Sequence, residues 1–290
     1  MTRPAPFHTL LRLIPALLTA WLLSGCSLIL FQPSDDFSLT PDILDIPYEE
    51  ITVTSGFNTL HGWHLKAQEK ERRGTVLFFH GNAGNISVQL LSVFWFPKYG
   101  YDVIMFDYSG YGKSEGFPGI ERIHRDGKVM LEWAVKHAPQ EEPLYLFAQS
   151  LGGSVATYSL VHSPDKSRFA MLILDSTFSS YKTLAKEALA EKSIPWLYIS
   201  FDVLIARYER FSQERFIDQV APVPLIIIHG SEDELVLPSH ALTLESKAKE
   251  PKELWIIDGA EHIKPVFNPG VRKRLIKAMQ KAAQAHADAP

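Results

Sequence analysis

Three residues in this chain have the side chains and the positions that nucleophilic catalysis needs. Ser150 lies between an apolar, strand-like run and a helix-compatible stretch. Asp233 follows the apolar run 225–228, and His262 follows the run 254–257. An aspartate holds the tautomer of a histidine, and the histidine takes the proton of a serine hydroxyl as that hydroxyl attacks a carbonyl carbon. The order serine, aspartate, histidine, with each residue after its own strand, predicts a catalytic triad.

The turn around Ser150 has the composition of a sharp bend between a strand and a helix. Residues 148–153 have the sequence Ala-Gln-Ser-Leu-Gly-Gly. So tight a turn needs small residues on both sides of the serine, and Ala148 and Gly152 meet that need. The backbone N–H of Leu151 is then predicted to donate to the oxyanion that forms during attack. The alternative is a glycine-rich turn in which Ser150 only caps the helix.

Structural roles are the alternative for the acid and the base. Aspartates that follow strands often cap helices, and an isolated histidine in a loop is usually solvated. Asp175 follows the run 171–174 and is a rival for the acid, because it also stands at a strand end. His80 and His229 precede glycines at strand ends, and we predict structural roles for both.

The body of the chain, from residue 48 onward, alternates short apolar runs with stretches of helical character. The predicted strands cover 51–54, 60–66, 75–79, 102–106, 144–147, 171–174, 225–228 and 254–257. The first two alternate in polarity around a Ser-Gly-Phe-Asn turn, which indicates a hairpin. The later runs suit strands buried on both faces of a parallel sheet. With helices predicted at 120–137, 154–161 and 271–287, the pattern predicts an α/β fold with two antiparallel leading strands and six parallel ones.

Two further motifs give the chain a family resemblance. His-Gly-Asn-Ala-Gly-Asn stands at 80–85, and Asp-Tyr-Ser-Gly-Tyr-Gly-Lys-Ser-Glu-Gly stands at 107–116. With the order of the triad, they make the chain from about residue 48 to about residue 285 resemble the α/β-hydrolase superfamily, in particular its serine-aminopeptidase-like and monoacylglycerol-lipase-like group. The resemblance implies a mostly parallel eight-stranded sheet with helices on both faces. It also implies that the backbone N–H of Asn82 is the second oxyanion donor.

Residues 176–222 are predicted to form an insert between the sixth and seventh strands. The insert has two helix-like stretches and an apolar group, namely Ile194, Trp196, Leu197, Tyr198, Phe201, Val203 and Leu204. A plain crossover needs fewer residues, so the favoured interpretation is a small helical cap that shapes an acyl or aromatic pocket. The alternative is a crossover helix and a long loop packed on the core.

The first 25 residues have the features of a secretory signal peptide. Arg3 and Arg12 accompany an apolar run at 13–23 that is too short for a comfortable transmembrane helix. The sequence Leu-Ser-Gly-Cys that ends at Cys26 resembles a bacterial lipoprotein cleavage box, which implies that Cys26 is lipidated. By the same resemblance, Ser27 replaces the aspartate that often retains lipoproteins in the inner membrane. Anchoring to the outer membrane, facing the periplasm, is therefore favoured over retention in the inner membrane. The alternative to a cleaved signal peptide is an N-terminal anchor helix that stays uncleaved.

The predicted organisation has three parts: the signal peptide at 1–25, a proline-containing tether at 26–47, and one hydrolase domain at 48–290. A net charge of −4 argues against binding to nucleic acid. One cysteine excludes an intramolecular disulfide, and the 11 histidines show no metal-ligand spacing. We therefore expect neither a cofactor nor a metal, because the nucleophile, the base and the oxyanion donors all come from the chain.

Three hypotheses for function follow. The first is hydrolysis of a carboxylic ester or thioester through an acyl-enzyme, on a small-molecule or lipid-like substrate at a membrane. The second is a peptidase or amidase that uses the same triad. The third is a non-catalytic lipoprotein that keeps the fold as a binding module. Only Ala148 favours this third hypothesis, because the family usually has glycine at that position.

Overall fold

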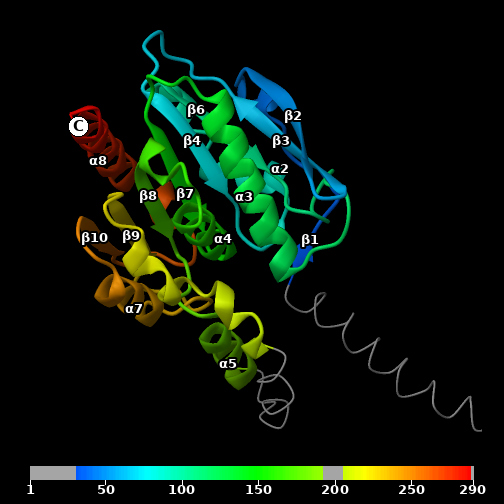
Figure 1. The fold of residues 1–290 in the computed structure, drawn as a ribbon, viewed down its shortest axis with the longest axis vertical. Helices are drawn as coiled ribbons and strands as arrows, with labels where there is room; N and C mark the ends of the chain where they lie inside the picture. The colour runs from blue at the N-terminus through cyan, green and yellow to red at the C-terminus, as the bar shows by residue number, and fades with distance from the viewer. Residues whose placement is uncertain (1–30, 192–204, 289–290) are drawn as a thin grey trace, which may run out of the picture.

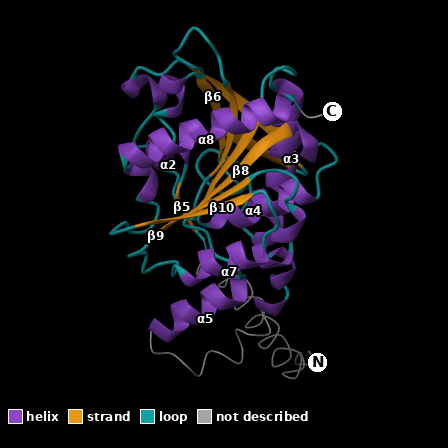
Figure 2. Ribbon diagram, turned by 90° about the vertical axis from the view of Figure 1, so that its left-hand side faces the viewer, coloured by secondary structure: helices purple, strands orange, loops and turns teal. Residues whose placement is uncertain are grey.

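The computed structural model describes residues 31–191 and 205–288. The predicted signal peptide, Cys26 and the apolar group at 194–204 lie outside these ranges. Within them, one eight-stranded sheet carries helices on both faces, as Figures 1 and 2 show. The predicted architecture, a mostly parallel α/β sheet, is confirmed.

The strands of the main sheet correspond to the eight predicted runs. They are β2 (Tyr48–Ser55), β3 (Asn58–Leu65), β4 (Gly74–Phe79), β6 (Tyr101–Phe106), β7 (Leu144–Gln149), β8 (Phe169–Asp175), β9 (Leu225–Gly230) and β10 (Lys252–Ile257). Their order across the sheet is β10-β9-β8-β7-β4-β6-β3-β2. Strand β3 pairs antiparallel with β2 and β6, and the other neighbours in this sheet are parallel.

The central strands are mostly apolar because both of their faces are buried. In β4, Leu77 and Phe79 belong to one hydrophobic core, whereas Val76 and Phe78 belong to the core on the opposite face. This alternation follows from the two-residue period of a strand. Each strand is thereby fixed in register by side chains on two sides.

Helices cover both cores. The α-helices are α2 (Ile86–Gln89), α3 (Ile120–His137), α4 (Leu151–Val161), α5 (Tyr181–Glu191), α7 (Ser239–Lys247) and α8 (Pro269–Ala287). Buried residues of α3 and α4 belong to the first core, and those of α2 and α8 to the second. Gly127 lets α3 approach α4 closely, because a Cβ at this position would collide with Val155.

Short elements complete the described chain. The 3-10 helices are η1 (Pro41–Leu44), η2 (Leu90–Ser92), η3 (Phe96–Tyr99), η4 (Lys166–Arg168), η6 (Glu209–Phe211), η7 (Gln213–Arg215), η8 (Ile217–Gln219) and η9 (Pro265–Phe267). The described parts of the predicted insert contain α5, η6, η7 and η8. None of the helices in the described ranges is both long and apolar enough to span a bilayer.

Residues 31–47, the described part of the predicted tether, lie against the domain. Strand β1 (Gln32–Pro33) pairs in parallel with β5 (Ala83–Gly84). The side chains of Phe31 and Ile46 are buried. The prolines of this stretch predicted a semi-extended spacer, and the structure differs because these apolar side chains reach the two cores of the domain.

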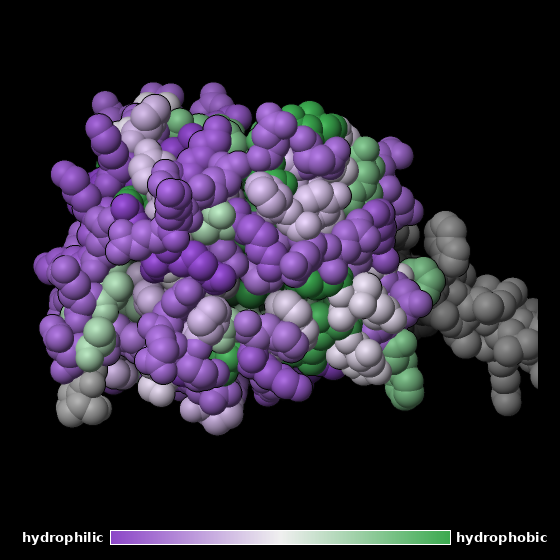
Figure 3. Space-filling model, turned by 90° about the horizontal axis from the view of Figure 1, so that it is seen from above, coloured by the Kyte–Doolittle hydropathy of each residue, from purple (hydrophilic) through white to green (hydrophobic). Residues whose placement is uncertain are grey.

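The carboxyl ends of the parallel strands meet at one edge of the sheet, toward α5 and α7 in Figure 1. In open α/β sheets, ligands bind at this edge. The opposite end of the molecule, seen from above in Figure 3, is mostly hydrophilic with scattered apolar residues. The loops after β4, β7, β8, β9 and β10 lie at this edge and carry the candidate site residues.

Candidate active site

Ser150 occupies the turn between β7 and α4 in a backbone conformation that residues other than glycine rarely adopt. Its φ and ψ are 51° and −118°, and its N–H donates to the Asp175 carbonyl at 3.0 Å. The turn requires Gly152, because a Cβ there would collide with the Phe79 carbonyl. Strained backbone of this kind persists only where the surrounding structure enforces it, and it is concentrated at functional sites. Ser150 is thereby held, partly exposed, at the carboxyl edge of the sheet.

Asp233 and His262, which follow β9 and β10, form a hydrogen-bonded pair. His262 Nδ1 lies 2.8 Å from Asp233 Oδ2. The other oxygen, Oδ1, accepts the N–H groups of Leu235 at 3.1 Å and Val236 at 2.8 Å. The Asp233 side chain is fully buried, whereas that of His262 is 18% exposed. Donation from Nδ1 to the carboxylate leaves Nε2 of a neutral imidazole free to accept a proton.

A second histidine contacts the same carboxylate. His229 Nε2 lies 3.3 Å from Asp233 Oδ2 and 2.7 Å from the Val236 carbonyl oxygen. Since a carbonyl only accepts, Nε2 of His229 carries the proton. Burial raises the pKa of Asp233, but hydrogen bonds from His229, His262 and the Val236 N–H outweigh burial and hold the pKa below its ordinary value. The carboxylate is therefore ionised throughout the neutral range.

Asp175, the rival acid, makes no hydrogen bond with His262 in the described structure. Its Oδ2 accepts the Gln149 side-chain amide at 2.7 Å, and its Oδ1 accepts the Ser176 hydroxyl at 3.3 Å. Burial raises the pKa of this carboxyl to about 6, although the bond from Gln149 lowers it. The Ser176 hydroxyl also accepts the N–H of Ile263, next to the candidate base, at 3.0 Å. Asp175 and Ser176 thus support the loops that carry the serine and the histidine.

The two predicted oxyanion donors belong to segments next to Ser150. The N–H of Leu151 is the first of α4, so it has no acceptor within the helix. A Cβ on Gly81 would lie 3.5 Å from the Ser150 Cβ, so the loop that carries Asn82 runs beside the serine. The Asn82 side-chain oxygen accepts the Tyr111 hydroxyl at 2.9 Å. No backbone acceptor for its N–H is found among the described residues.

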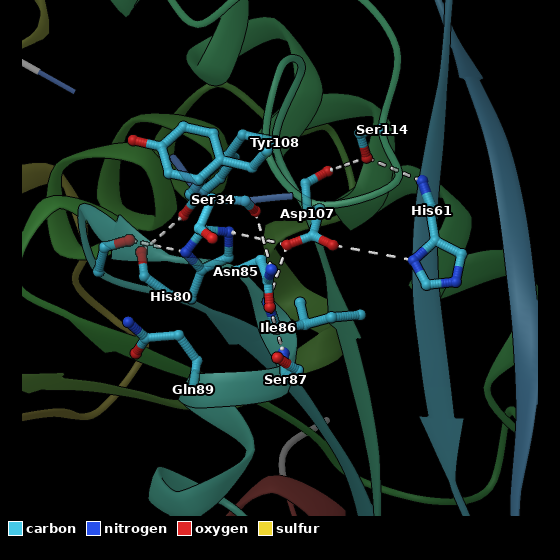
Figure 4. A network of polar contacts seen from close by, with 12 residues as sticks. Ser34, His61, His80, Asn85, Ile86, Ser87, Gln89, Asp107, Tyr108 and Ser114 are labelled. Atoms are coloured by element: carbon cyan, nitrogen blue, oxygen red, sulfur yellow. Dashed lines mark hydrogen bonds and ion pairs between the residues drawn. The ribbon is translucent and has the colours of Figure 1, made fainter. Parts of the chain in front are cut away.

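A buried polar network supports this loop (Figure 4). Asp107 accepts the N–H of Ile86 at 2.8 Å, and the same oxygen lies 3.9 Å from His80 Nε2. The Tyr108 hydroxyl donates to the His80 carbonyl at 3.1 Å. His80 Nδ1 lies 2.7 Å from the Gly81 carbonyl oxygen, and burial lowers the pKa of the ring. A neutral His80 that donates to Gly81 fits the structural role that the sequence predicts for it.

The structure brings Asp233 and His262 together, and both follow parallel strands that end on the same side of the sheet as β7, which precedes Ser150. The Ser150 hydroxyl and His262 Nε2 make no hydrogen bond with each other within the described residues, and such bonds often tighten only when substrate binds.

Two residues near the site were not assigned to it from the sequence. His229 was predicted to be structural, and its spacing of four residues before Asp233 was the available signal. Tyr111 gave no signal, because it is one residue of a turn motif and its contact with Asn82 joins distant parts of the chain.

Comparison with known proteins shows the family to which the chain belongs. A family model described as "Serine aminopeptidase, S33" matches residues 70–215, about half of the chain. The chain belongs to this α/β-hydrolase family. The uncharacterized protein YfhR of Escherichia coli K12 is 35% identical over 238 residues, which cover 80% of this chain and 79% of that protein. The lysophosphatidylserine lipase ABHD12 of Danio rerio is 30% identical over 185 residues, which cover 60% of this chain and 47% of that protein.

The fold is also shared with solved hydrolases. An esterase of Pyrococcus furiosus superimposes with a TM-score of 0.68 at 20% identity, over 88% of this chain and 98% of that chain. A likeness at this identity concerns the fold alone. It confirms the predicted α/β-hydrolase fold, and the family membership supports hydrolase chemistry.

Proposed function

We propose that the protein is a serine hydrolase that cleaves a carboxylic ester or thioester through an acyl-enzyme. The observation that carries this proposal is the strained Ser150 at the sheet edge that also holds the Asp233–His262 pair, 2.8 Å apart. A serine in this conformation is costly unless its position is used. An imidazole oriented by a buried carboxylate is the base that such a nucleophile needs.

Each group has a defined task in the proposed reaction. His262 Nε2 takes the hydroxyl proton of Ser150 as Oγ bonds to the acyl carbon, and the N–H groups of Leu151 and Asn82 bind the oxyanion. His262 then gives the proton to the departing alkoxide or thiolate as its bond to the acyl carbon breaks. A water molecule, deprotonated by the same imidazole, releases the acid and restores the Ser150 hydroxyl.

The proposal extends to the place of the reaction and its substrate. Lipidation of Cys26 would anchor the domain to the bacterial outer membrane, facing the periplasm, and the lipoprotein-like sequence at 23–26 supports this. The substrate class is a small-molecule or lipid-like acyl compound. The lipase among the relatives supports a lipid-like substrate.

The test uses the full chain and a fluorophosphonate, which labels activated serines. Labelling is expected for the unaltered protein and is lost in both Ser150→Ala and His262→Ala. Ser163→Ala, which changes a serine just beyond α4, is the matched control and keeps the label. A folded protein that takes no label would contradict the proposal and favour a non-catalytic binding module.

A peptidase or amidase on the same triad is the second candidate. The description of the matching family as a serine aminopeptidase favours it. Turnover of aminoacyl amides in preference to short acyl esters and thioesters, lost in Ser150→Ala, would select it over the esterase.

A further inference from the structure

The first described residues of the chain are seated on the loop that carries the proposed oxyanion donor. We call residues 31–38 the N-terminal strap. Its strand β1 pairs with β5, so that Gln32 faces Ala83 and Pro33 faces Gly84. The N–H of Ser34 extends this pairing by donating to the Gly84 carbonyl at 3.1 Å. The strap therefore forms backbone pairs with the two residues that follow Asn82.

A buried asparagine fastens the strap to the same loop (Figure 4). Asn85 Nδ2 donates to the backbone carbonyls of Ser34 at 2.8 Å and Asp36 at 2.9 Å. Its Oδ1 accepts the N–H of Ser87 at 2.9 Å and caps α2. Asn85 is fully buried. The side-chain amide of Asn85 thus donates to two carbonyls of the strap, and its oxygen caps the helix α2 that follows the loop.

Tyr111 connects the strap to Asn82 itself. The ring of Phe31 packs edge-on against the Tyr111 ring, with centroids 6.4 Å apart, and Phe31 is 4% exposed. Burial raises the pKa of Tyr111, and a backbone hydrogen bond from Gln32 to the same hydroxyl partly opposes this rise. The hydroxyl donates in turn to the Asn82 side-chain oxygen at 2.9 Å. A chain of contacts therefore runs from the strap through Tyr111 to the residue that supplies the oxyanion donor.

The loop needs such support because its own backbone is permissive. Its sequence includes Gly81 and Gly84, and Gly84 has a φ of +77°, so the loop imposes little conformation on Asn82. An oxyanion donor must be held to within about 0.5 Å of its productive place. The side chains of Tyr111 and Asn85 and the backbone of the strap supply restraints that the loop lacks.

We propose that the N-terminal strap is a positioning element of the oxyanion hole. Docking of the strap sets the direction of the Asn82 N–H through Tyr111 and Asn85, and turnover depends on that docking. The inference rests on the proposed function, because it concerns the oxyanion of that reaction. Tyr111 is a positioning residue, since it acts on the reacting atoms only through Asn82.

The test compares two variants of the full chain with two controls. Tyr111→Phe removes the hydroxyl that holds Asn82, and Phe31→Ala removes the buried anchor of the strap. Each is expected to lower kcat by about tenfold with KM changed by less than about twofold, which is less than the 10²–10³-fold effect of losing a whole oxyanion donor. The double variant is expected to lose less than the product of the two effects, because both act through the same contacts.

The controls separate positioning from stability. Tyr145→Phe also removes a buried tyrosine hydroxyl, which donates to the Met279 carbonyl at 3.1 Å, away from the loop. Asp35→Ala changes an exposed side chain of the strap. Both are expected to keep kcat. If Tyr145→Phe lowered kcat as much as Tyr111→Phe does, the effect would belong to stability, and the proposal would be overturned.

Hydrogen exchange at residues 80–85, measured by mass spectrometry, reports docking without any catalysis. Exchange is expected to be faster in Phe31→Ala than in Asp35→Ala. Faster exchange with an unchanged kcat would overturn the role of the strap and leave the proposed function intact. An unaltered protein with neither turnover nor a labelled Ser150 would instead refute the proposed function, and this inference with it.

Discussion

His229 Nε2 lies 3.3 Å from Oδ2 of Asp233, the same oxygen that pairs with His262. With the N–H groups of Leu235 and Val236 on Oδ1, the carboxylate has four donors. Donors of this kind favour the ionised form of a carboxylate and restrict its rotation. The carboxylate in turn orients the imidazole with which it pairs. His229 therefore contacts the carboxylate of Asp233 in addition to packing at the end of β9.

Replacement of His229 should lower turnover according to whether a donor remains. His229→Ala removes the proton donor to Asp233 and is expected to lower kcat by about tenfold, because the carboxylate is free to turn. His229→Gln keeps an N–H near the same place and is expected to retain most of kcat. Steady-state kinetics compare the two variants, and their melting temperatures check that both are folded under the assay conditions. Equal losses in both variants would mean that the ring only fills space.

Asp233→Asn should be far more damaging to turnover. The amide favours the wrong tautomer of His262, and kcat is expected to fall by about 10³–10⁴-fold. The folded pKa of Asp233 is depressed below the ordinary value of 3.8, so the stability that its ionised form contributes is present above that pH and lost as the pH falls through the folded pKa. Thermal melts at pH 2–4 should therefore vary less with pH in Asp233→Asn than in the unaltered protein.

The contribution of Asp175 to the stability of the fold has the opposite dependence on pH. Its pKa is about 6 in the folded chain, against an ordinary value of 3.8. The folded state therefore binds the proton more tightly, so this contribution to stability is full below pH 3.8 and is lost as the pH rises to about 6. At pH 8, this difference between the folded and the ordinary pKa lowers the free energy of unfolding by about 3 kcal/mol.

Asp175→Asn should remove this loss of stability, because the amide oxygen can still accept the bond from Gln149. We expect the variant to melt several degrees above the unaltered protein at pH 8 and to match it near pH 4. Scanning calorimetry at the two pH values tests the expectation. The same increment at both pH values would show that charge is not the cause.

The backbone strain at Ser150 also has a measurable consequence. Glycine adopts a φ of 51° and ψ of −118° far more readily than alanine does. Both Ser150→Gly and Ser150→Ala should be inactive, but the glycine variant should be the more stable by about 1 kcal/mol. Denaturant unfolding of the two variants measures the difference. An alanine variant of equal or greater stability would argue that the turn is unstrained.

The positions of the central strands could be predicted from the sequence because each is a short apolar run whose residues are buried on both faces of the sheet. In β7, all of Leu144–Gln149 is buried. Parallel strands end at a common edge, so residues that follow β7, β9 and β10 were expected to gather there. The order of the strands alone, without any side-chain detail, therefore places Asp233 and His262 in the same region.

The support of the site could not be predicted in the same way. Asn85 holds Ser34 across 51 positions of the chain, and no local pattern encodes such a contact. Strand β1 is two residues long and contains Pro33, features that indicate a spacer. The direction of the Asn82 N–H depends on backbone geometry, so the sequence reached this donor only through family resemblance.

The position of β10 at the edge of the main sheet bears on how the proposed site could be lost. Within the described residues, β10 pairs with β9 on one side and with no strand on the other. A strand with one partner opens locally more readily than a central strand does. Since Asp233 follows β9 and His262 follows β10, opening of this edge would break the 2.8 Å contact between the two side chains while β7 and the turn at Ser150 stay folded. Partial unfolding would thereby remove the proposed base before it removes the proposed nucleophile.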